Sequence, residues 1–130
     1  TLFVHGGLTP FYAEYGLDKL NQETRDWLLG NTTKPKFLED PDGPVWCRLY
    51  APYCINKISD KQVQDMLKSL NCKRMVVGHC VQSQGIKSSY NNKVWLIDTG
   101  ISSLYGGVLQ ALKISNDGNV CILSSKTQKK

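Results

Sequence analysis

The chain has 130 residues, of which 41% are hydrophobic, and a formal net charge of +5 at pH 7. This length allows one domain with its own core, and no apolar run reaches the 18 residues of a bilayer span. Three positive charges lie in a polar tail, at Lys126, Lys129 and Lys130. Because the other basic residues alternate with acidic ones, the sequence lacks the clustered basic face typical of nucleic-acid binding. We expect neither a nucleic-acid nor a membrane partner.

The predicted elements begin with a strand over residues 1–5, a short apolar run that stops at Gly6-Gly7. Apolar residues at helical spacing predict a helix over residues 17–29 that ends before Gly30. Residues 31–44 hold three prolines and no apolar period, which predicts a long loop. Ser59 and Gln62 have the spacing of a capping box, so a second helix should begin there and end near Asn71.

Two more strands and a hairpin complete the predicted order. Short apolar runs at residues 74–78 and 94–98 predict the strands, and residues 109–115 and 119–124 alternate apolar and polar around Asn116-Asp117-Gly118. Strands interspersed with helices indicate a mixed α/β fold. We expect one folded unit over residues 1–125, followed by a basic polar tail over 126–130.

The five cysteines include no pair with the spacing of a zinc-binding CxxC. Such a set is typical of reduced, mostly buried thiols in an intracellular protein. We therefore expect an intracellular location. The compartment stays undefined because residues could precede Thr1.

Only two histidines are present, and each comes directly after a predicted strand: His5 before Gly6-Gly7, and His79 after Gly78. Open α/β sheets bind ligands at the carboxyl ends of strands, where neutral imidazoles suit zinc, iron or manganese. The alternative is a pair of structural, hydrogen-bonded imidazoles. Two histidines do not complete a metal shell, and Asp98 could either contribute to one or cap the turn at Gly100.

Arg48 lies in an aromatic segment bracketed by Pro44 and Tyr50. Its planar guanidinium matches two oxygens of a phosphate group. The alternative is a surface arginine whose stem packs on Trp46 or Tyr50. The residues alone leave both roles open.

Residues 3–10 (FVHGGLTP) resemble the HGGL segment of phosphoprotein phosphatases, and residues 75–79 (MVVGH) resemble their later VVGH segment. Residues 15–27, 44–48 and 94–107 resemble the Shewanella-like protein phosphatases in particular. The similarity covers nearly the whole chain, and the ordered series of motifs is more specific than any one of them. The chain thus resembles the carboxy-terminal half of a calcineurin-like metallophosphoesterase domain of the phosphoprotein phosphatase superfamily.

This resemblance implies half of a four-layered α/β/β/α sandwich that holds two adjacent metal ions, which could be manganese, iron or zinc. His5 and His79 would be ligands of one metal, and Arg48 would be the catalytic residue that binds the substrate phosphate. The family motifs GDxHG, GDxxDRG and GNHE, which carry the other metal's ligands, the bridging aspartate and the general-acid histidine, do not occur in this sequence. A missing amino-terminal half, in the same or another chain, is therefore the expected partner.

The implied activity is hydrolysis of phosphate monoesters, with a phosphorylated protein or a small phosphoester as substrate and with this chain inactive on its own. One alternative is a non-catalytic structural or interaction subunit that keeps a phosphatase-like half fold. Another is a dinucleoside polyphosphate hydrolase, since substrate loops vary on one scaffold. Cys80, where the family often has threonine, would make the site sensitive to oxidation if it were exposed.

Overall fold

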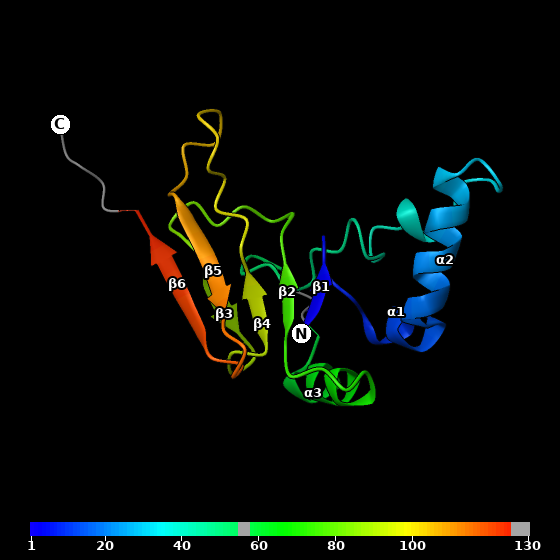
Figure 1. Ribbon diagram of the computed structural model, residues 1–130, viewed down its shortest axis with the longest axis horizontal. Helices are drawn as coiled ribbons and strands as arrows, with labels where there is room; N and C mark the ends of the chain where they lie inside the picture. The colour runs from blue at the N-terminus through cyan, green and yellow to red at the C-terminus, as the bar shows by residue number, and fades with distance from the viewer. Residues whose placement is uncertain (55–57, 126–130) are drawn as a thin grey trace.

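Figure 1 shows the computed structural model, which describes residues 1–54 and 58–125; the predicted basic tail lies outside these ranges. The chain order is β1 (Leu2–Val4), α1 (Pro10–Tyr15), α2 (Leu17–Leu28), the 3-10 helix η1 (Lys36–Leu38), α3 (Asp60–Ser69), β2 (Met75–Val77), β3 (Lys87–Ser89), β4 (Val94–Leu96), β5 (Gln110–Ile114) and β6 (Val120–Ser124). The predicted α/β class is confirmed. No helix in the described ranges has the length and apolar character needed to span a membrane.

The main sheet has four strands in the order β1-β2-β4-β3, and its first three are parallel. The register aligns Val4 with Val77, and Val77 with Leu96, so the parallel strands end side by side. Beyond the strands, the backbone N–H of Gly78 donates to the carbonyl of His5 at 2.8 Å. The loops that follow the three strands therefore leave the sheet at one edge, the upper one in Figure 1.

The core lies on the face of the sheet that packs against the helices. Met75 and Val77 of β2 point into it and are 0% and 1% exposed, while α3 contributes Val63, Met66 and Leu67. The capping box at the start of α3 is confirmed: the Ser59 hydroxyl accepts from the Gln62 N–H at 3.2 Å, and the Gln62 side chain accepts from the Ser59 N–H at 3.0 Å. Such a cap stabilises a helix by about 1 kcal/mol.

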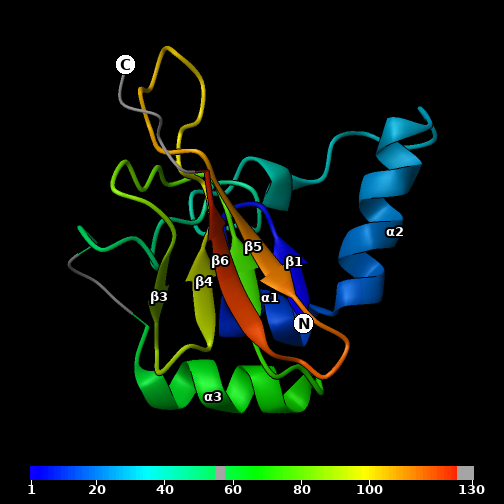
Figure 2. The same ribbon diagram turned by 60° about the vertical axis from the view of Figure 1, so that its left-hand side comes forward.

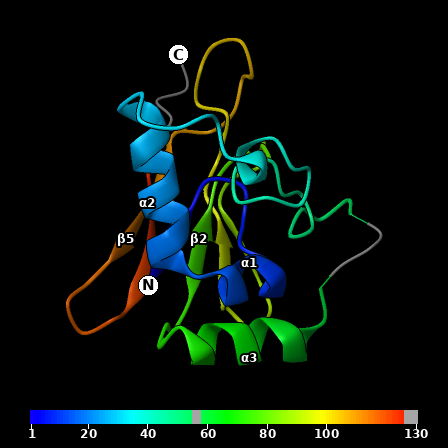
Figure 3. The same cartoon turned by 90° about the vertical axis from the view of Figure 1, so that its right-hand side faces the viewer.

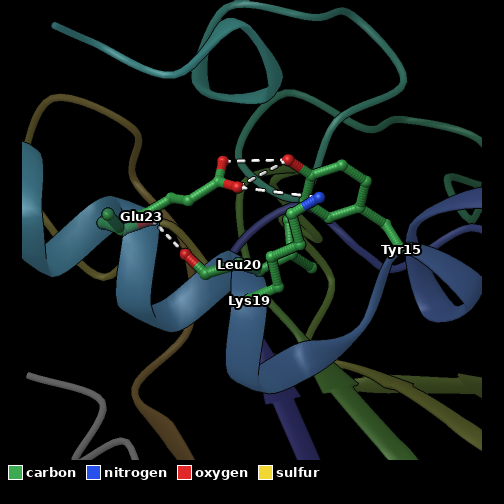
Figure 4. A network of polar contacts seen from close by, with 5 residues as sticks. Tyr15, Lys19, Leu20 and Glu23 are labelled. Atoms are coloured by element: carbon green, nitrogen blue, oxygen red, sulfur yellow. Dashed lines mark hydrogen bonds and ion pairs between the residues drawn. The ribbon is translucent and has the colours of Figure 1, made fainter. Parts of the chain in front are cut away.

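A polar network joins the end of α1 to α2 (Figure 4). The Tyr15 hydroxyl lies 2.8 and 2.9 Å from the two carboxylate oxygens of Glu23, and the Lys19 ammonium lies 4.2 Å from the centre of the Tyr15 ring. Only Leu20 of α2 is buried, and Leu28 is 70% exposed although it falls at a core position of the helical period. The end of α2 at Leu28 thus has little cover within the described residues.

The predicted hairpin is confirmed as β5 and β6, which pair in antiparallel register and lie across the face of the sheet opposite the helices (Figures 2 and 3). Two side chains tie it to the rest of the chain. The Arg74 guanidinium donates to the carbonyl of Gly118 at 2.6 Å, and the Ile86 N–H donates to Oε1 of Gln110 at 2.8 Å. No hairpin residue belongs to the buried core.

The cysteines depart in part from the expectation of mostly buried thiols. Cys47 and Cys80 are buried, but Cys54 and Cys72 are half-buried and Cys121 is exposed. Cys121 is open to solvent because it lies on β6, which contributes nothing to the core. No disulfide occurs within the described residues.

Candidate active site at the carboxyl ends of the parallel strands

The two histidines lie close together at the upper edge of the sheet. Their ring centroids are 5.1 Å apart and their planes are inclined by 61°. His5 directly follows β1 and His79 comes two residues after β2, so the parallel register explains how residues 74 positions apart meet. His5 is exposed, and His79 is half-buried.

His79 has two features that are unusual for a structural histidine. Its backbone φ is 63°, a left-handed conformation that side chains other than glycine seldom adopt. Its Nε2 atom is buried and has no hydrogen-bond partner. Burial lowers the pKa of His79, as do the positive charges of Arg48 and His5, against a smaller opposite effect of Asp98. The ring therefore favours the neutral form, in which an imidazole nitrogen can bind a metal.

Gly6 and Gly7 allow the segment from Pro44 to Tyr50 to approach the loop after β1. The Gly6 N–H donates to the carbonyl of Pro44 at 2.8 Å, and a Cβ on Gly6 would lie 2.7 Å from the carbonyl oxygen of Val45. A Cβ on Gly7 would lie 2.6 Å from the ring of Tyr50. The paired glycines are thus needed for close packing, which places residues 44–50 beside His5.

Arg48 reaches the edge of the sheet through this packing. The ring of the neighbouring Trp46 lies 5.5 Å from the His79 ring, nearly perpendicular to it, and the Trp46 Nε1–H donates to the carbonyl of Leu38 at 3.0 Å. The exposed guanidinium of Arg48 is close enough to lower the pKa of His79. It forms no ion pair with an acidic residue in the described part of the chain. The structure therefore brings Arg48 and both histidines together.

Asp98 follows β4 at the same edge, and its Oδ1 accepts from the N–H of Gly100 at 3.0 Å. This is the turn-capping role that the sequence left open. The carboxylate is also near enough to His79 to raise its pKa. The turn thus holds a negative charge beside the two histidines.

Tyr53 also belongs to the site, although nothing in the sequence indicated it. Its side chain lies close to the Cys80 thiol and to Arg48: the proximity of Cys80 raises the pKa of Tyr53, while that of Arg48 lowers it. Consecutive turns bring Tyr53 back towards Arg48, since the Ala51 N–H donates to the carbonyl of Arg48 at 2.9 Å. Cys80 is only 4% exposed, so the condition for its sensitivity to oxidation is not met here.

The residues present fit one side of a metal site. The imidazole of His79, whose buried Nε2 lacks a hydrogen-bond partner, and the neighbouring ring of His5 are suitable donors for zinc, iron or manganese. Within the described residues, however, no group of three or more histidine, cysteine, aspartate or glutamate side chains is placed to hold a metal ion.

No protein-family profile matches the sequence. Curated relatives do match, among them Shewanella-like protein phosphatase 2 of Arabidopsis thaliana, which is 32% identical over 130 residues that cover 96% of this chain and 33% of the relative. Shewanella-like protein phosphatase 1 of Plasmodium berghei is 31% identical and covers 78% of this chain and 30% of the relative. An uncharacterised protein of Schizosaccharomyces pombe is 32% identical, with 95% and 38% covered.

Among solved structures, a mutant of a cold-active protein tyrosine phosphatase has a TM-score of 0.66 at 25% identity and covers 94% of this chain and 40% of that chain. The cold-active protein tyrosine phosphatase of a psychrophilic Shewanella species shows the same fold, with a TM-score of 0.66 at 23% identity and 94% and 40% covered. The chain is therefore related to phosphatases. It spans about a third of the length of the curated relatives that it matches.

Proposed function

We propose that this chain forms one side of the active site of a two-metal phosphatase, as the carboxy-terminal half of a calcineurin-like metallophosphoesterase domain of the phosphoprotein phosphatase superfamily. The observation that carries the proposal is the pair of histidine rings 5.1 Å apart, with the buried Nε2 of His79 lacking any partner. A structural histidine would satisfy that nitrogen with a hydrogen bond. A ligand histidine keeps it available.

His5 and His79 would hold one of two metal ions, which would be manganese, iron or zinc. When bound, the metals supply Lewis acidity and an activated hydroxide for attack on a phosphate monoester. The contribution of the chain is to bring the two imidazoles together and to keep that of His79 neutral. The low pKa of His79 and its fixed backbone serve this purpose.

Arg48 would bind the substrate phosphate. Its guanidinium is exposed and not engaged by an acidic residue of the described chain, so its donors are available for two phosphate oxygens. A fixed positive charge there stabilises the negative charge that the oxygens gain in the transition state. The side chain of Tyr53, which lies close to both Arg48 and Cys80, would orient the guanidinium.

The remaining ligands would come from an amino-terminal half that docks on this chain. Exposed apolar residues lie on both faces of the sheet and beside it, such as Phe3 of β1, Leu28 of α2 and Leu123 of β6. Docking of the other half would cover them and complete a four-layered sandwich.

The test uses the longer protein that contains this chain, or this chain in complex with its amino-terminal half. We expect manganese-dependent hydrolysis of p-nitrophenyl phosphate, and we expect His79→Asn to lose both bound metal and activity. Lys113→Ala, an exposed change on β5, is the control and should retain both. If the His79→Asn variant keeps its full metal content and turnover, the chain does not supply the proposed ligand.

A further inference from the structure

We propose that a hollow beside Arg48 is a subsite for acidic residues that flank the phosphorylated residue of a peptide substrate; this inference rests on the proposed function. The hollow has a volume of about 410 Å³, within the range of known ligand sites, and Tyr53, Val81, Ser83 and Lys87 are among the residues that line it. Tyr53 forms one wall, and the turn in which the Ala51 N–H donates to the carbonyl of Arg48 brings Tyr53 beside that arginine, so the hollow adjoins the proposed phosphate position. A peptide whose phosphate contacted Arg48 would extend into it.

The wall formed by residues 80–86 is held in place from several sides. The Gln82 N–H donates to the carbonyl of Asp98 at 2.7 Å, and the Gln82 Nε2 donates to the carbonyl of Cys80 at 2.8 Å. Gly85 then turns the chain at a φ of 111°, pressed against Gln110 so closely that a Cβ would lie 2.5 Å from Oε1. The hollow is therefore formed before a peptide binds, which reduces the ordering cost of binding.

The positive charge of the hollow beside Arg48 would favour acidic residues of a substrate peptide. Lys87 lies exposed on the edge strand β3 and forms no ion pair within the described residues. No carboxylate of the described residues lines this hollow, and Arg48 adds a second positive charge next to it. Asp60 lines a neighbouring hollow that Lys87 also lines, but it forms no ion pair with Lys87. An aspartate or glutamate of a substrate peptide would find a free ammonium at this position.

The experiment compares two phosphopeptides that differ only in having aspartates or serines beside the phosphorylated residue. With the complete protein we expect kcat/KM for the acidic peptide to be about threefold to fivefold higher, the size of an exposed charge pair. Lys87→Glu should reverse or abolish this preference without changing the hydrolysis of p-nitrophenyl phosphate, which is too small to reach the hollow. Lys113→Glu makes the same charge change on β5 and should leave the preference intact.

Equal kcat/KM for the two peptides, or a preference that survives Lys87→Glu, would overturn the subsite. Binding of the same peptides with a non-hydrolysable phosphonate, followed by fluorescence anisotropy, gives a second readout that needs no turnover. If p-nitrophenyl phosphate is not hydrolysed, the proposed function fails, whereas the anisotropy ratio still decides the subsite. A Lys87-dependent preference in binding supports the subsite, and its absence refutes it.

Discussion

Arg48 and the two histidines reach one edge of the sheet by different routes. His5 and His79 are placed by the ends of adjacent parallel strands, whereas Arg48 arrives on a loop that packs against Gly6-Gly7. The histidines can therefore be displaced only with the sheet, while the arginine depends on local packing. Their proposed roles divide along the same line: His5 and His79 would bind a metal ion, and Arg48 would bind the substrate phosphate.

Substitution of these residues should separate metal binding from phosphate binding. In the complete protein, Arg48→Ala should lower kcat by about 10²–10³ with metal content unchanged, because one electrostatic stabiliser is lost. Arg48→Lys should restore part of the rate, since an ammonium cannot reproduce two parallel hydrogen bonds. His5→Ala should lose metal. Elemental analysis and steady-state kinetics measure metal content and turnover. An unchanged kcat in Arg48→Ala would mean that Arg48 does not bind the phosphate and serves only in packing.

Gly6 is a position where one methyl group should disturb the site. In Gly6→Ala the new Cβ would meet the backbone oxygen of Val45 at 2.7 Å, and backbone cannot move aside as a side chain can. We expect a loss of about 1–3 kcal/mol in the free energy of unfolding, typical of overpacking. Gly78→Ala is the matched control, because its Cβ would meet only ordinary contacts, the nearest at 3.6 Å. Equal denaturation midpoints for the two variants would show that the loop has room to adapt.

Sequence reasoning located the histidines and Arg48 but not their surroundings. Each histidine follows an apolar strand, and this pattern is visible in the sequence without knowledge of the tertiary structure. Tyr53 gave no such signal, because its contacts with Arg48 and Cys80 depend on the turns of residues 48–54. The left-handed backbone of His79 was equally invisible, since it is set by the packing of the loop after β2.

Among the elements, those with an apolar period, a short apolar run or a capping box were predicted, whereas α1, η1 and β3 were not. The helix α2 and the hairpin follow their apolar periods, and the strands β2 and β4 follow their apolar runs. Helix α1 is too short to show a period, although Thr9 and Pro10 form a typical helix start. Strand β3 is Lys87-Ser88-Ser89, which has no strand propensity and is a strand only because it pairs with β4.

The contact between α1 and the loop before the aromatic segment makes a pH-dependent contribution to stability. The Tyr12 hydroxyl donates to the Asp40 carboxylate, which lowers the pKa of Asp40 from 3.8, while burial and this bond raise the pKa of Tyr12 from 10.0 to about 12. The contribution of Asp40 is therefore fully present above its ordinary pKa of 3.8 and is lost as the pH falls through its lowered pKa in the folded state. That of Tyr12 is present below pH 10 and lost as the pH rises through 12.

Tyr12→Phe should consequently destabilise the protein by about 1–2 kcal/mol at pH 7, the value of a hydrogen bond to a charged group that is partly exposed. The difference from the wild type should shrink as the pH falls through the lowered pKa of Asp40 in the folded state. Denaturant unfolding at pH 7 and in a series of acidic buffers measures it. A difference of the same size throughout the series would mean that the hydroxyl contributes independently of the charge on Asp40.

At the scale of the whole molecule, many large apolar side chains are exposed. The loop between β4 and β5 carries Ile101, Leu104 and Tyr105, which are 61%, 85% and 62% exposed. This loop stands above the sheet in Figure 1, on the side where the proposed site lies. Apolar surface of this extent is typical of an interaction face.

The chain on its own should therefore be inactive and poorly stable. We expect no hydrolysis of p-nitrophenyl phosphate with manganese, and we expect strong binding of a hydrophobic dye that falls when the amino-terminal half is added. Calorimetry and dye fluorescence measure these properties. Robust turnover by residues 1–130 that disappears in His79→Ala would contradict the need for a second half, as would a cooperative melt without dye binding.

The left-handed backbone of His79 also has a thermodynamic consequence. A non-glycine residue in this region costs about 1–2 kcal/mol, and the unpartnered Nε2 adds the cost of a buried polar atom. The fold alone would be more stable with glycine or asparagine at this position. A ligand on Nε2 would remove the second cost, so the melting temperature should depend on metal in the wild type and be insensitive to metal in His79→Asn.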